Sequence, residues 1–141
     1  MISFDNAFFK YLSGFIWFDQ DRLEALMKRY PIGVTEQGEP IFWHINAENK
    51  ITNGHILTMG SETSKVYDDS WYYQDGRPTC LFGEHLLGTF PSQTLALVSD
   101  EMTAAIMSSF PHSLRLAGYR KRKSDSHPFA STCRKLFGRV S

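Results

Sequence analysis

The residue types that most often carry chemistry are present in this chain, but their spacing matches no known catalytic or metal-binding pattern. Neither Cys80 nor Cys133 lies in a CxxC spacing, and the histidines form no HxH or HExxH motif. A zinc site needs three or four ligands at usable spacing. GxSxG, P-loop and GxGxxG motifs are also absent. The sequence therefore predicts no catalytic residue, no metal and no cofactor. The scattered histidines are His44, His55, His85, His112 and His127.

Two short acidic motifs are the remaining candidates for acid–base chemistry. Glu84 and His85 stand next to each other beside an apolar stretch, and such a pair could act as an acid and a base. A pair on the surface of a helix is the favoured interpretation. Asp68 and Asp69 are adjacent in a polar segment, where a solvated pair or a turn cap is favoured over a magnesium site.

Two helices are predicted within the first thirty residues. Apolar residues recur every three or four positions from Phe4 to Phe15, with Ser3 or Asp5 as the cap. A second helix is predicted over 21–30, with Asp19 as its cap.

An antiparallel β-meander is predicted over 31–60. Three β-rich runs at 32–35, 41–46 and 51–59 are separated by short turn-type connections. Gly54 inside the third run predicts a bulge or a close backbone approach. Side chains alternate between two sides of the second run, with Ile41, Trp43 and Ile45 on one side and Phe42, His44 and Asn46 on the other.

The second half of the chain is predicted to be a long polar loop at 61–79, then a βαβ unit within 80–118, then a basic tail at 119–141. A short helix is expected within 80–90, and an apolar strand at 94–99 precedes a helix at 100–110 and a strand at 113–118. Two strands joined by a helix this short are expected to be parallel, with a right-handed crossover. The predicted fold class is α/β, α+β overall, in a single domain over 1–141.

Charge is distributed very unevenly along the chain. Residues 1–114 hold seven Lys and Arg against fourteen Asp and Glu, a net of −7, whereas residues 115–141 hold eight against one, a net of +7. This asymmetry indicates an acidic partner or a tail that docks on its own body. No apolar run approaches the ~20 residues that span a bilayer, and no signal-peptide pattern opens the chain. A cytoplasmic protein without a membrane partner is predicted.

Several segments together resemble an uncharacterised Toprim-like, primase-associated family of bacterial mobile elements. They are the meander with IFWHI at 41–45, LFGEHLL at 81–87 and LALVSDEMTAAI at 95–106, and the match covers most of 8–118. Members of that family place an FW-rich meander ahead of an LFGEHLL helix. A strand ending in Val-Glu follows, and then a helix that begins Ser-Glu-Lys-Thr-Ala. The resemblance implies that residues 80–118 are a Toprim-like βαβ unit.

The departures from that family pattern fall at its catalytic positions. In Toprim domains the glutamate that ends the first strand is a general acid/base, and a later Asp-x-Asp pair holds Mg²⁺. Here Ser99 occupies the glutamate position, Asp100 replaces the serine and Glu101 keeps the second acid. Asp125 is the last acid of the chain, so the Asp-x-Asp pair has no counterpart. The resemblance thus implies a degenerate, truncated domain without catalysis.

Two functions of different classes stay open from the sequence. The first is binding of nucleic acid, or of a replication or mobilisation protein, in which consecutive cations contact phosphates and aromatic residues of 67–73 stack on bases. The second is a protein-interaction or assembly module, such as a homodimer, joined through an exposed edge strand or helix face. The proposed nucleic-acid-binding residues are Arg120, Lys121, Arg122 and Lys123.

Overall fold

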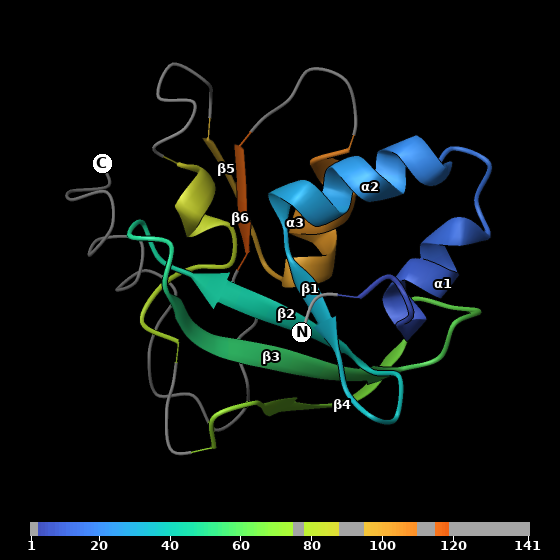
Figure 1. The fold of residues 1–141 in the computed structure, drawn as a ribbon, viewed down its shortest axis with the longest axis horizontal. Coiled ribbons are helices and arrows are strands. Elements are labelled where there is room, and N and C mark those ends of the chain that lie inside the picture. The colour runs from blue at the N-terminus through green and yellow to red at the C-terminus, as the bar shows by residue number, and fades with distance from the viewer. Residues whose placement is uncertain (1–2, 75–77, 88–94, 110–114, 119–141) are drawn as a thin grey trace.

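Two β-sheets and three α-helices make up the computed structural model, which describes residues 3–74, 78–87, 95–109 and 115–118 (Figure 1). An antiparallel sheet has the strand order β1-β2-β3-β4. These strands are Ile32–Val34, Pro40–Ile45, Ile51–Met59 and Val66–Trp71. Strands β5 (Leu95–Val98) and β6 (Arg115–Gly118) form a separate parallel pair. The fold is therefore mixed α and β of the α+β kind.

The helices are α1 (Ala7–Ser13), α2 (Gln20–Arg29) and α3 (Glu101–Met107), and a 3₁₀ turn, η1, covers Glu84–Leu86. Asp19 caps α2 as predicted, because its side chain accepts a hydrogen bond from the Arg22 backbone N–H. The predicted cap of α1 is wrong: Asn6 accepts from the Phe9 N–H instead. Asn6 also donates its side-chain amide to the Ser3 carbonyl, so it satisfies backbone groups on both sides.

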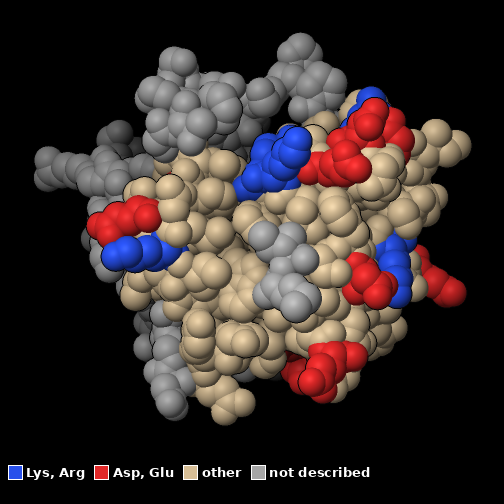
Figure 2. Space-filling view, in the orientation of Figure 1, with Lys and Arg blue, Asp and Glu red and all other residues tan. Residues whose placement is uncertain are grey.

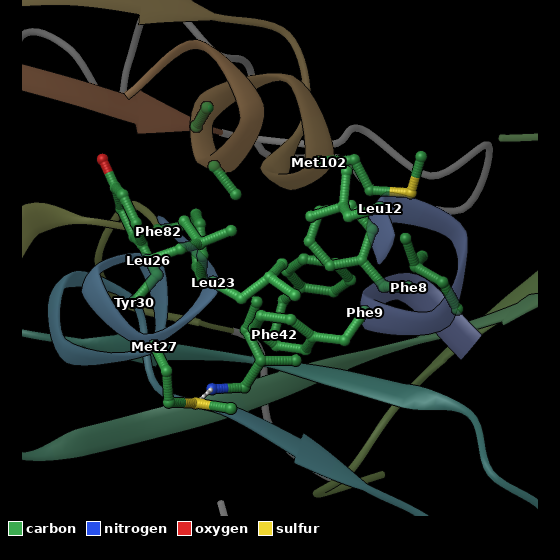
Figure 3. Close-up of a cluster of buried hydrophobic side chains, with 14 of the residues drawn as sticks. Phe8, Phe9, Leu12, Leu23, Leu26, Met27, Tyr30, Phe42, Phe82 and Met102 are labelled. Atoms are coloured by element: carbon green, nitrogen blue, oxygen red, sulfur yellow. Dashed lines mark hydrogen bonds between the residues drawn. The ribbon is translucent and has the colours of Figure 1, made fainter. Parts of the chain in front are cut away.

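One apolar core lies between the helices and the four-stranded sheet (Figures 1 and 3). Phe42 of β2 meets Phe8 of α1 and Phe82 edge-on, and Phe82 stacks on Tyr30 with ring centroids 4.8 Å apart. Met102 of α3 belongs to the same cluster. Elements from the N-terminal helices, the meander and the βαβ unit thus bury their apolar side chains together.

The opposite face of the sheet carries a second buried cluster, Ile41, Trp43 and Ile45. The predicted alternation along β2 is therefore confirmed. Gly54 of β3 lies under this cluster, where a Cβ atom would stand 2.6 Å from Ile41 Cγ2 and 2.7 Å from the Trp43 ring. The close approach predicted for Gly54 is confirmed, whereas the register shifts lie at His44/Ile45 and Thr58/Met59.

The prediction of a long loop over 61–79 is wrong, because β4 lies within it. β4 pairs antiparallel with β3, with Trp71 opposite His55 and Val66 opposite Met59. Asp68 and Asp69 lower the β-propensity of this segment, but pairing with a nine-residue neighbour outweighs that local preference. The predicted strand–helix–strand order with a parallel pair is confirmed, while the expected helix in 80–90 is only the turn η1 in its described part.

Candidate functional site

Three elements bring polar side chains together inside the protein. His44 of β2, His55 of β3 and Glu101 of α3 are fully buried. Antiparallel pairing sets His55 opposite Phe42, so both histidines come from the strand face that carries the main core. The cap residue Asp100 begins α3 by accepting from the Thr103 N–H at 2.8 Å, which makes Glu101 the first residue of the helix.

These side chains form a continuous chain of short polar contacts. Glu101 Oε2 lies 3.2 Å from His44 Nε2 and 2.5 Å from His55 Nδ1. The other nitrogen of His44, Nδ1, donates to the Cys80 carbonyl at 3.0 Å. The other nitrogen of His55, Nε2, lies 2.5 Å from Asp69 Oδ2 on β4. Because the Asp69 side chain is 26% exposed, the chain of contacts runs from the core to the protein surface.

The two contacts of His55 bear on its protonation. Each of its ring nitrogens lies next to a carboxylate oxygen, and the oxygen of an ionised carboxylate can only accept a hydrogen bond. A neutral imidazole carries hydrogen on one nitrogen only, so both contacts are satisfied when His55 is an imidazolium. The cation then lies between two carboxylates, which compensate its buried charge.

The surroundings of His55 and Glu101 favour the same charge state. Burial disfavours the imidazolium, but Glu101 and Asp69 outweigh it and raise the pKa of His55 above its ordinary value. Burial also acts against the carboxylate of Glu101, yet His55 and His44 hold the pKa of Glu101 well below its usual range. Trp71 stacks on the His55 ring with centroids 4.3 Å apart, and an aromatic face attracts a cation.

The three residues at the Toprim-like positions are placed very differently. Ser99 is exposed, directly after β5. Both carboxylate oxygens of Asp100 accept from Thr103, through its backbone N–H and its hydroxyl. Only Glu101 joins the buried network. The predicted nucleic-acid-binding residues Arg120, Lys121, Arg122 and Lys123 lie outside the described residues.

Two interpretations of the acidic motifs need correction. Glu84 is buried, and His85 donates from Nε2 to the Arg29 carbonyl at 2.8 Å, so these residues are not a surface pair. Asp69 contacts His55 and is neither a solvated carboxylate nor a turn cap, whereas its neighbour Asp68 is exposed. Successive side chains of a strand point to opposite faces of the sheet, so β4 places Asp69 on the face that carries His55 and Leu57, and Asp68 on the other face.

Sequence reasoning missed that His44, His55 and Glu101 converge. One signal was available: His44 shares its side of β2 with the core residue Phe42, so a buried polar group was implied. Within the part of the chain that the structure describes, no group of three or more His, Cys, Asp or Glu side chains is arranged to hold a metal ion. The network consists of the contacts of His44 and His55 with Glu101, Asp69 and the Cys80 carbonyl.

An α+β domain with an ionic network in its core is the class that this geometry defines. Residues 6–136 match the family described as domain of unknown function DUF6371, and the chain belongs to that family. No curated protein and no solved structure matches the chain. Among the described residues, no helix has the length and apolar character to cross a membrane.

Proposed function

We propose that this chain is a non-catalytic, degenerate Toprim-like and primase-like domain of a bacterial mobile element, and that it binds nucleic acid or a replication or mobilisation protein in the cytoplasm. The observation that carries the non-catalytic part is the burial of Glu101. This acid aligns with the second Toprim acid, but its Oε2 already contacts two histidine rings. A fully buried carboxylate cannot reach a phosphate in solvent. Ser99, at the position of the catalytic glutamate, has no carboxylate to offer.

The distribution of charge supports binding of a polyanion by the tail rather than by the body. On the face shown in Figure 2, Lys and Arg side chains stand in small separate groups next to Asp and Glu. Residues 115–141 instead carry a net of +7, the difference between eight basic residues and one acidic residue. Four adjacent cations at 120–123 are suited to neutralise phosphates without reading bases.

Binding of a short DNA duplex at several salt concentrations tests this function. With about four phosphate contacts, a plot of the logarithm of the association constant against the logarithm of the salt concentration should have a slope of about −3 to −4. Replacing Arg120, Lys121, Arg122 and Lys123 by Ala should abolish binding measured by fluorescence anisotropy. Non-specific affinity is expected to be micromolar or weaker, and equal for unrelated duplex sequences.

A variant with the same loss of charge on the body is the matched control. Lys10, Lys28, Lys50 and Lys65 are all exposed, and their replacement by Ala should leave most of the affinity in place. Equal losses in the two variants would contradict the assignment to the tail. A wild-type chain that binds no DNA at low salt would contradict nucleic-acid binding altogether.

A protein-interaction or assembly module is the second candidate, and one surface feature favours it. The connection between α1 and α2 exposes three consecutive apolar side chains, Phe15, Ile16 and Trp17. Ile16 is 99% exposed. Exposed apolar residues that are contiguous in this way mark contact surfaces more often than single ones do.

A further inference from the structure

Helix α3 is held to the rest of the protein by two sets of polar contacts. At its first residue, Glu101 contacts His44 and His55 on the four-stranded sheet. After its last turn, the hydroxyls of Ser108 and Ser109 accept from the Arg29 guanidinium of α2 at 3.4 and 3.2 Å. The contact at Glu101 is ionic and fully buried, whereas the contacts at Arg29 are only partly buried.

We propose that His55 is a proton-dependent clamp, which ties α3 and β4 to β3 while both of its ring nitrogens carry hydrogen and releases α3 when one hydrogen is lost. This inference goes beyond the binding function, because it concerns how the fold responds to pH. A neutral imidazole has one N–H, so one of its two carboxylate partners would face a ring lone pair. When the lost hydrogen is the one on Nδ1, the ring lone pair faces the fully buried carboxylate of Glu101, and breaking such a buried contact is strongly destabilising.

Among the described residues, the groups that face His55 come from α3, β4 and β2. Glu101 of α3 and Asp69 of β4 contact its two nitrogens, and Trp71 of β4 stacks on the ring. His44 of β2 reaches it through the shared Oε2 of Glu101. Both carboxylates oppose loss of the proton. The pKa of Glu101 lies far below neutrality, so this carboxylate stays ionised while His55 titrates.

The direction of the response follows from the raised pKa of His55. Such a group contributes stability that is fully present below the ordinary histidine value of about 6.5. That contribution is lost as the pH rises through the folded-state pKa. The clamp should therefore loosen on the alkaline side and not in mild acid.

Amide hydrogen exchange from pH 6 to pH 10, corrected for the intrinsic rate, measures this release on the whole chain. At pH values above the ordinary histidine pKa, the opening constant of α3 should increase by at most about tenfold per pH unit, since one proton is lost. The amides of α2 should change less. In His55→Gln the α3 amides should exchange faster at pH 6, with no further pH dependence.

His85→Gln is the matched control, because His85 donates to the Arg29 carbonyl and is absent from the network. This variant should keep the wild-type pH profile of α3. If His55→Gln does not fold, nitrogen-15 NMR of the wild-type histidines tests the clamp instead, and it should report two protonated ring nitrogens for His55 at pH 6. A neutral His55 tautomer at pH 6, or α3 exchange that does not change with pH in the wild type, would overturn the clamp.

Discussion

At the scale of single residues, Glu101 is the side chain that links the two histidines of the core. One of its oxygens serves two histidines from two different strands. A buried ion pair is not by itself strong evidence of net stabilisation, since both charges were better solvated in water. Removing one member of a buried pair lowers the stability of the protein, because the charge of the other member then lies in the core without its partner.

Glu101→Gln should lower the free energy of unfolding by about 3–5 kcal/mol, the usual cost of breaking a buried pair by removing one partner. Urea denaturation at pH 7 measures it. Glu62→Gln is the control, since Glu62 is exposed and should change stability by less than about 0.5 kcal/mol. Similar values for the two variants would contradict the ionic network. Mg²⁺-dependent cleavage or primer synthesis that disappears in Glu101→Gln would contradict the non-catalytic function.

The positions of these residues along the chain explain why the network could not be predicted. His44 and Glu101 are 57 residues apart and come from different supersecondary units, so no local spacing links them. Glu101 was singled out only through the proposed alignment with the Toprim-like family, and that alignment assigned it no structural role. Strand alternation placed His44 on the same side as Phe42, but it did not indicate that this side faces the main core.

At the scale of elements, the β2–β3 pair contributes side chains to a buried cluster on each of its two faces. One face presents the two histidines to the core, and the other packs Trp43 against Gly54. Local patterns predicted both strands, since β-rich runs and short turns are strong signals. β4 was missed because its pairing with β3 is decided by the neighbouring strand and not by its own residues.

Gly54→Ala should destabilise the protein by about 1–3 kcal/mol, the usual cost of overpacking. The added methyl group would lie within 2.7 Å of Ile41 and the Trp43 ring. Gly60→Ala is the matched control, because a Cβ there meets no atom within 4 Å. Thermal unfolding of both variants measures the difference. Equal midpoints would contradict the prediction, because they would show that the Ile41 and Trp43 side chains can move to accommodate the methyl group.

At the scale of the whole molecule, two features bear on the two proposed functions. The basic residues gather after position 114, whereas the exposed apolar turn lies between the first two helices. Composition alone revealed the first of these. The second needed the structure, since Phe15 was predicted to belong to the apolar stripe of the first helix, and α1 ends at Ser13.

If the chain is an assembly module, Ile16→Ser should weaken its self-association by about ten- to a hundredfold, since burying such a side chain contributes about 1.5–3 kcal/mol. Sedimentation velocity over a concentration series measures it. Ile51→Ser is the control, because Ile51 is a half-exposed isoleucine that lies on β3, away from this turn in the sequence. A wild type that stays monomeric at the highest soluble concentration would contradict self-assembly.

The shared contacts of the buried network have an evolutionary consequence. One oxygen of Glu101 contacts both His44 and His55, so a change at any of these three positions removes a polar contact from its partners in the core. Well-packed apolar side chains at all three positions together would avoid that conflict, since such exchanges are often neutral or stabilising. In the DUF6371 family these three positions should therefore covary, and mutations at them should show strong epistasis. Stepwise replacement of the polar residues by apolar ones would then pass through single mutants that are less stable than either the polar or the apolar core.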